Sequence, residues 1–257
     1  MSTAAVPQDL DDGRMPLMEH LTELRDRIIK VVIAVVIGML IAFILYNQIF
    51  DVLIEPYAKS CTNSVSNCEL LATDPLEGFG VRMKLSLYGG IFIAMPVILW
   101  QLWRFITPGL YAHEKRYAIP FMLSALTLFL LGAAIAFWTL PQALTFLQSI
   151  AGDNIVNAYS PTKYFTLITY MMLAFGIGFE FPIVLVAAQM IGVLTPQALA
   201  GVRRYAWVGI TVLVAVITPS GDPISMLALS IPMIVFYEMS ILIGKIVQRR
   251  KRAAAPA

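Results

Sequence analysis

Apolar residues are grouped along this chain into six runs, separated by shorter polar segments. The runs cover residues 28–46, 84–106, 118–140, 165–193, 205–218 and 224–244. Only an α-helix satisfies its own backbone hydrogen bonds in lipid over runs of this length, and the sequence lacks the alternation typical of a membrane β-barrel. The pattern therefore predicts an all-α integral membrane protein with six transmembrane helices.

The last two runs are expected to form a tight hairpin of short helices. The fifth run has 14 residues, which give about 21 Å of helix against about 30 Å of hydrocarbon. Between the two runs, the prolines and the glycine of TPSGDP (218–223) prevent the helix from continuing. We therefore expect the bilayer to thin, or water to enter, beside this hairpin.

The polar segments complete a single membrane domain over residues 1–257. An N-terminal segment (1–27) precedes the first helix, and a basic tail (245–257) follows the last. Within the N-terminal segment, the helical period of the apolar residues predicts an amphipathic helix at the membrane surface, with Glu23 and Arg27 as an i,i+4 ion pair. The long connections 47–83 and 141–163 are expected to fold into a cap.

Composition agrees with a lipid environment for most of the chain. Hydrophobic residues make up 59% of the sequence, charged residues only 13%, and the mean hydropathy is +0.78. These values lie far outside the range of soluble proteins. No basic groove with interleaved aromatic residues indicates nucleic-acid binding, since the one dense basic run directly follows a membrane segment.

The lysines and arginines predict the orientation. With a cytoplasmic N-terminus, fourteen of the 18 basic residues lie on the inner side and four on the outer side. The positive-inside rule then places both termini in the cytoplasm.

Glu180 lies near the middle of the fourth run and is followed directly by Phe181 and Pro182. An ionisable group at that depth costs at least about 2.5 kcal/mol, so it needs a partner, water or a proton. The proline should bend the helix beside the carboxylate. No basic residue of the chain lies at the same depth, so we expect the partner to be a polar group on another subunit; a protonated glutamate bonded to a neighbouring helix is the alternative.

Glu23 and Glu114 form an acidic pair on an inner face that is otherwise strongly basic. Carboxylates accept bidentate hydrogen bonds from arginine in a geometry that lysine cannot match. A peptide with adjacent arginines is therefore a suitable ligand, although each glutamate could also be a solvated surface residue.

The sequence offers no candidate enzyme centre, metal site or cofactor site. It has no Ser/His/Asp or Cys/His arrangement, no cluster of metal ligands and no phosphate-binding glycine loop.

Cys61 and Cys68 both lie in the first outer connection, where a disulfide would close an eight-residue loop and contribute about 2.5 kcal/mol. Two free thiols are the alternative.

Four ordered motifs resemble the TatC family, the multispanning core subunit of the twin-arginine protein translocase. They are HLTELRDR (20–27), FITPGLYAHEKR (105–116), AFGIGFEFPI (174–183) and TPSGDP (218–223). The resemblance implies a glove-shaped bundle in the bacterial cytoplasmic membrane. It also implies a receptor that binds twin-arginine signal peptides of folded cargo and docks single-span subunits of the TatA/TatB type for export driven by the proton motive force. The complex would be hetero-oligomeric, with several copies of this chain.

The resemblance also assigns roles to individual residues. Signal-peptide binding falls on Glu23, Arg25, Arg27, Phe105 and Glu114, partner docking on Glu180, and matched family positions on Pro56, Asp222 and Glu238. For Glu238, which lies near the inner end of its helix, a side chain that merely reaches the interface is an alternative. The rival function is a proton- or ion-coupled secondary transporter, which would predict an internal repeat and paired discontinuous helices.

Overall fold

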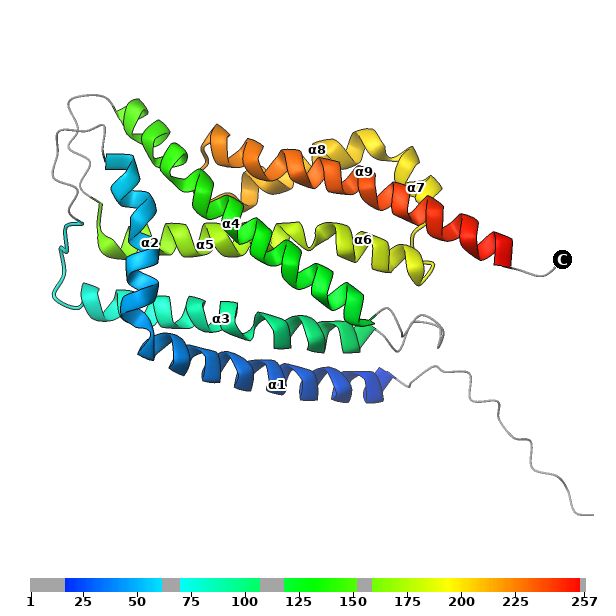
Figure 1. Cartoon of the computed structure of the whole chain (residues 1–257), viewed down its shortest axis with the longest axis horizontal. Coiled ribbons are helices and arrows are strands. Elements are labelled where there is room, and N and C mark those ends of the chain that lie inside the picture. Colours follow the sequence, from blue (N-terminus) through cyan, green and yellow to red (C-terminus); the bar gives the residue numbers. More distant parts are fainter. Residues whose placement is uncertain (1–16, 62–69, 107–117, 152–158, 255–257) are drawn as a thin grey trace, which may run out of the picture.

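The described part of the chain is built entirely from helices, as the hydrophobic pattern predicts. The computed structural model describes residues 17–61, 70–106, 118–151 and 159–254. In chain order, the helices are α1 (Leu17–Ile44), α2 (Tyr46–Cys61), α3 (Glu77–Ile106), α4 (Ala118–Ala151), α5 (Pro161–Phe179), α6 (Phe181–Met190), α7 (Pro196–Gly201), α8 (Arg203–Ile217) and α9 (Pro223–Ala254). The long helices form one bundle, which α2 crosses near one end (Figure 1).

The two ends of the bundle differ in what they contain. Helix α1 begins and α9 ends at the same end, where α3 also ends and α4 begins (Figure 1). We call this the inner end, because the count of basic residues predicts that it faces the cytoplasm. The outer end is the one where α2 lies and where α3 and α5 begin.

Five stretches are long and apolar enough to cross a membrane by length and composition. They are Leu21–Ile44, Glu77–Phe105, Ile119–Ile150, Pro161–Met190 and Pro223–Gln248. The fifth apolar run forms α8, whose 15 residues are too few for an undistorted bilayer, as expected. A sixth crossing through α8 stays a prediction.

The expectation of a short last helix is wrong, since α9 has 32 residues. The polar residues after Gly244 include no proline or glycine and continue the helix.

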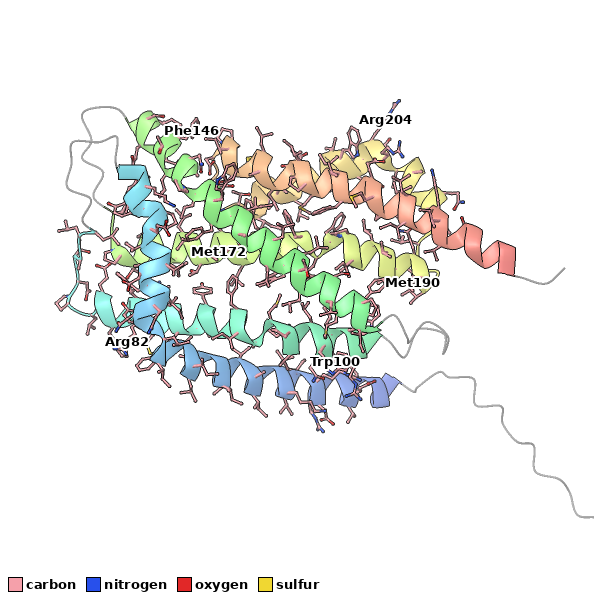
Figure 2. The ribbon with its side chains drawn as sticks, viewed as in Figure 1. Arg82, Trp100, Phe146, Met172, Met190 and Arg204 are labelled. Carbon is pink, nitrogen blue, oxygen red and sulfur yellow. The ribbon has the colours of Figure 1, made fainter. Side chains whose placement is uncertain are left out.

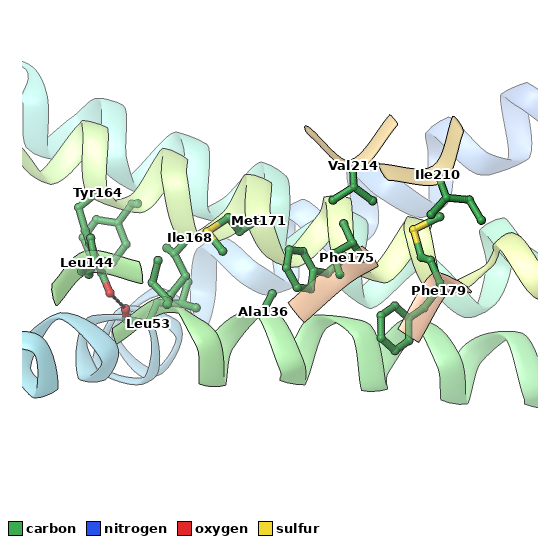
Figure 3. Packing of buried hydrophobic residues seen from close by; sticks show 14 of the residues in the cluster. Leu53, Ala136, Leu144, Tyr164, Ile168, Met171, Phe175, Phe179, Ile210 and Val214 are labelled. Atoms are coloured by element: carbon green, nitrogen blue, oxygen red, sulfur yellow. Dashed lines mark hydrogen bonds between the residues drawn. The ribbon is translucent and has the colours of Figure 1, made fainter. Parts of the chain in front are cut away.

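Helix α5 supplies the centre of the packing. Phe165, Ile168, Met171, Phe175 and Phe179 are all buried and recur at the helical spacing of three and four residues. Figure 3 shows this row packed against side chains of α2, α4 and α8. Lipid is as apolar as these side chains, so close van der Waals packing rather than escape from water holds the helices together.

Close glycine crossings make that packing possible. A Cβ atom built on Gly132 of α4 would lie 2.5 Å from the carbonyl oxygen of Phe175, and one on Gly176 of α5 would lie 2.5 Å from the ring of Phe129. Gly178 similarly faces Leu229 of α9 at 3.2 Å. Gly176 and Gly178 therefore both lie at close contacts between helices.

Helix α1 lies at the edge of the bundle and is joined to α3 by one such crossing. A Cβ on Gly38 would lie 2.5 Å from the carbonyl oxygen of Gly90, and a Cβ on Gly90 would lie 2.5 Å from the backbone nitrogen of Met39. Only 11% of the apolar stretch of α1 is buried, compared with 44% of Pro161–Met190. Most of the apolar surface of α1 is therefore left for lipid or another chain.

Candidate functional site

The N-terminal motif places its charged residues on the first turns of α1, at the inner end of the bundle. Arg27 donates to the carboxylate of Glu23, and both side chains are largely buried, with 13% and 23% of their surface exposed. The predicted i,i+4 ion pair is therefore confirmed. Arg25 is exposed and pairs with Asp26, whose Oδ1 lies 3.1 Å from the Arg25 Nη2. Glu23 is thus already held by one guanidinium of its own chain.

The register of α1 and α3 brings Glu23 close to the start of the first inner loop. The two helices run antiparallel and cross at Gly38 and Gly90. Glu23 lies fifteen residues before Gly38, and Phe105 lies fifteen residues after Gly90. Because both helices rise by the same distance per residue, Glu23 and Phe105 reach the same level at the inner end. Phe105 is half-buried there. Glu114 lies outside the described residues, in the connection that leaves α3 immediately after this level.

Glu180 lies at the junction of α5 and α6, where the membrane helix is interrupted. Its backbone keeps a right-handed helical conformation (φ −73°, ψ −17°), and its carbonyl still accepts from the nitrogens of Ile183 and Val184 at 3.0 and 3.1 Å. Pro182 lies in the first turn of α6 and is buried. The helix is interrupted at Glu180, the bend expected from Pro182 stays a prediction, and the carbonyl of Glu180 remains hydrogen-bonded.

The carboxylate of Glu180 has no partner in the described part of the chain. Its Oε1 atom is buried and accepts no hydrogen bond there. Glu180 borders a small cavity of about 60 Å³ between α3, α4 and α6, which is otherwise lined by Leu99, Leu102, Trp103, Phe121, Met122, Ala125, Ile183, Val184 and Ala187. None of these side chains is basic, as the depth argument predicted. The geometry leaves the carboxyl group able to accept a donor from outside the chain.

Glu238 has partners that the sequence did not reveal. Its Oε1 lies 3.0 Å from Nε of Arg203 and 3.2 Å from Nε1 of Trp207, both on α8. Arg203 and Trp207 are four residues apart and therefore lie on one face of α8, a spacing that could have indicated a shared partner. Glu238 thus joins α8 to α9 instead of simply reaching the interface.

The remaining candidates lie in or near the outer end. Pro56 is buried within α2. Asp222 is buried before α9, where its Oδ1 accepts from the backbone nitrogen of Ser225 at 2.7 Å, a helix-capping contact. Cys61 is the last residue of α2, while Cys68 lies outside the described residues, so the candidate disulfide stays a prediction.

Glu77 is a buried acid that sequence reasoning missed. It accepts from the backbone nitrogens of Thr73 and Thr162 at 2.9 and 3.0 Å, and from the hydroxyl of Ser160. These bonds join the start of α3 to the start of α5. The partners on α5 lie more than 80 residues away along the chain, so no local pattern could identify them.

Comparison with known proteins gives consistent matches along the chain. The sequence model of the family described as Sec-independent protein translocase protein (TatC) matches residues 19–232. The Sec-independent protein translocase protein TatC of Aquifex aeolicus strain VF5 is 42% identical over 241 residues, covering 93% of this chain and 98% of that protein. The protein of the same name from Frankia casuarinae is 36% identical over 249 residues, covering 94% of this chain and 68% of that protein. A solved crystal structure, described as the twin arginine translocase receptor TatC in DDM, has a TM-score of 0.74 at 41% identity and covers 88% of this chain and 99% of that chain.

Proposed function

Because this chain belongs to the TatC family, we propose that it is the receptor subunit that binds twin-arginine signal peptides at the inner face of the Tat translocase. As a member of the family it is a multi-pass membrane component of a protein translocase, works with other Tat subunits and is not an enzyme.

The level of Glu23 beside the end of α3 is the observation that carries the proposal for signal binding. Helix α3 ends at Ile106, one residue after Phe105. The connection that holds Glu114 therefore starts near the level of Glu23. In this proposal, Glu23 and Glu114 each accept a guanidinium of the signal. Arg27 already pairs with Glu23, so an incoming arginine must share or replace that contact. Arg27 would then position Glu23 rather than contact the signal directly, whereas exposed Arg25, paired with Asp26, keeps its proposed role in signal binding.

A photoreactive twin-arginine peptide tests this proposal. In Glu23→Gln/Glu114→Gln, we expect crosslinking to fall by about tenfold or more, since hydrogen bonds to charged groups contribute about 1.5–3 kcal/mol each. A twin-lysine peptide should crosslink weakly to the unmodified protein, because lysine cannot form the bidentate contact. Glu55→Gln is the matched control, because Glu55 also forms an i,i+4 pair, with Lys59, but lies on α2 at the outer end. Unchanged crosslinking in the double variant would refute the acidic-pair mechanism.

We further propose that Glu180 docks a polar group from the membrane helix of a single-span TatA/TatB-type subunit. The buried, unpartnered Oε1 and the apolar cavity beside it support this role. Glu180→Ala should leave peptide crosslinking intact and weaken crosslinks between this chain and the partner helix. Loss of peptide binding with unchanged partner contact would show that the roles are assigned wrongly.

The setting proposed for this activity is the bacterial cytoplasmic membrane, with both termini in the cytoplasm and several copies of the chain in a hetero-oligomeric complex. Export of folded cargo would be driven by the proton motive force. The first and last helices have their free ends at the same end of the bundle, which is compatible with this orientation (Figure 1). Protease protection of tags at the two termini in inverted and right-side-out vesicles tests it.

The rival transporter hypothesis gains no support from the described helices. It requires paired discontinuous helices, whereas α1, α3, α4 and α9 are each continuous and only the stretch Pro161–Met190 is interrupted among the long apolar helices described.

A further inference from the structure

An apolar pocket lies in the angle between α2 and the two helices that it crosses, α3 and α5. Its volume is about 420 Å³. Ile49 and Val52 of α2, Leu85 and Phe92 of α3, and Met172 of α5 supply much of its wall. We call it the elbow pocket, because the bend between α1 and α2 at Leu45 forms one of its edges.

Water is a poor occupant of the elbow pocket. A buried water needs two to four polar partners. Gln48, Tyr88 and Thr169 are the polar residues among those that line the pocket, and the Thr169 hydroxyl already donates to the carbonyl of Phe165. The pocket also opens toward the surface, because Val52 and Ile93 in its wall keep 57% and 41% of their surface exposed. In a membrane protein that surface faces lipid, so an apolar chain from the bilayer can enter.

Arg82 supplies a positive charge on the outer side of the same bend. Its guanidinium carbon lies 4.3 Å from the ring centre of Phe43 and 5.0 Å from that of Tyr46. These two rings hold the guanidinium on the bend at the outer end, where Figure 2 shows Arg82. Arg82 is exposed and forms no ion pair with any described acidic residue. A planar guanidinium with free donors is well suited to a phosphate group.

The spacing along α3 connects the charge to the pocket. Gly89 and Ile93, which line the pocket, lie seven and eleven residues after Arg82 and therefore on nearly the same face of the helix. Eleven residues correspond to about 16 Å of helix, close to the thickness of one hydrocarbon leaflet, about 15 Å. A phosphate bound at Arg82 would thus lie at the headgroup level, with the pocket at the depth of the acyl chains below it.

We propose that the elbow pocket binds one acyl chain of an outer-leaflet phospholipid whose phosphate is held by Arg82. The charge favours a phospholipid over a partner's membrane helix, whose apolar side chains offer nothing to the guanidinium. The width also favours a lipid, because a helix about 10–12 Å across would have to fit into the corner beneath α2. This site is separate from Glu23 and Glu180, and it depends on the membrane location of the chain but not on the proposed signal binding.

The test uses the full chain in liposomes that contain phosphatidylglycerol with a photoreactive diazirine in one acyl chain. We expect labelled peptides from α2 and from the outer half of α3. In Arg82→Gln the labelling should fall by about fivefold, the effect of one basic residue at a membrane surface. In Val52→Trp the indole should fill the pocket and reduce labelling similarly. Diacylglycerol with the same diazirine should label the unmodified protein weakly, because it lacks the phosphate.

Two matched controls accompany these variants. Lys163→Gln removes another charge at the outer end, from a half-buried residue in the first turn of α5, and Val36→Trp adds an indole to an exposed, lipid-facing position of α1; both should label like the unmodified protein. If Arg82→Gln aggregates, Arg82→Lys replaces it. Its labelling is expected to fall less, because lysine keeps the positive charge but lacks the paired donors of the guanidinium. The proposal is overturned if Arg82→Gln and Lys163→Gln label equally, if diacylglycerol labels as strongly as phosphatidylglycerol, or if a photoreactive residue at Val52 crosslinks to another polypeptide instead of lipid.

Discussion

Replacing Gly38 by alanine should move α1 away from α3 and weaken the binding of a twin-arginine peptide. The new Cβ would lie 2.5 Å from the carbonyl oxygen of Gly90, whereas ordinary contacts of a Cβ begin at 3.4 Å. The obstacle is backbone in the middle of a long helix, so no side chain can swing aside. The axes must separate by about 0.9 Å, the difference between those two distances.

The energetic effect is the balance of two terms. Overpacking a close contact costs about 1–3 kcal/mol. Alanine also has a better helix propensity than glycine, by up to about 1 kcal/mol. The matched control Gly209→Ala isolates the second term, because a Cβ on Gly209 of α8 meets no atom within 4 Å. The two variants should therefore differ by about 1–3 kcal/mol, with Gly38→Ala the less stable.

Two measurements check this expectation. Thermal unfolding in detergent should separate the two variants by about 2–4 °C for each kcal/mol. Crosslinking of a photoreactive twin-arginine peptide should fall in Gly38→Ala and not in Gly209→Ala, because only the first change shifts Glu23 relative to the inner end of α3. If Gly38→Ala and Gly209→Ala have the same melting temperature, and Gly38→Ala binds the peptide as the unmodified protein does, this crossing does not position Glu23.

Three further substitutions test polar contacts by thermal unfolding. Glu77→Ala leaves the backbone nitrogen of Thr162 without its acceptor at the outer end and should lower the melting temperature below that of the unmodified protein; an unchanged melting temperature would contradict this. Glu238→Ala removes the acceptor shared by two α8 side chains and should cost about 1 kcal/mol, since the group is partly exposed. Gly244→Ala should displace Gln189, whose Oε1 would lie 1.7 Å from the new Cβ, and cost about 1 kcal/mol through its bond to the carbonyl of Ser240. Gly209→Ala is again the control, and stability equal to it would refute the last expectation.

The features predicted correctly from the sequence are those that depend on near neighbours in the chain. Hydrophobic runs indicate helices because each helix satisfies its own backbone. The ion pair of Glu23 and Arg27 follows from their four-residue spacing. The end of α9 was placed too early because the apolar run ends at Gly244, whereas the helix continues through polar residues that are good helix formers.

The features that sequence reasoning missed depend on contacts between distant segments. Glu77 receives hydrogen bonds from residues 83 and 85 positions away, and Glu238 binds a side chain 31 positions away. Nothing in the local pattern around either acid distinguishes a buried, bonded carboxylate from a solvated one. The pocket beneath α2 was also unpredictable, because it depends on the angle at which α2 crosses the bundle.

Polar contacts between distant segments join three helices at the outer end of the bundle. At the outer end, the hydroxyl of Tyr164 donates to the carbonyl of Leu53 at 2.7 Å (Figure 3), and Nζ of Lys84 lies 3.2 Å from the hydroxyl of Thr166. With the Glu77 contacts, these bonds fix α2, α3 and α5 to one another.

Helix α3 is therefore the element that borders both proposed sites. Its last turns reach the level of Glu23, and Leu99 and Trp103 in the same part of the helix line the cavity beside Glu180. Trp103 is stacked on Phe121 of α4, with ring centres 4.7 Å apart, so a shift of this part of α3 must carry or break that stack. With the outer half of α3 held by the contacts of Glu77 and Lys84, a signal peptide that displaces its inner half would change the space beside Glu180 without disturbing the outer end. Coupling between signal binding and partner docking is thus expected to pass through the inner half of α3.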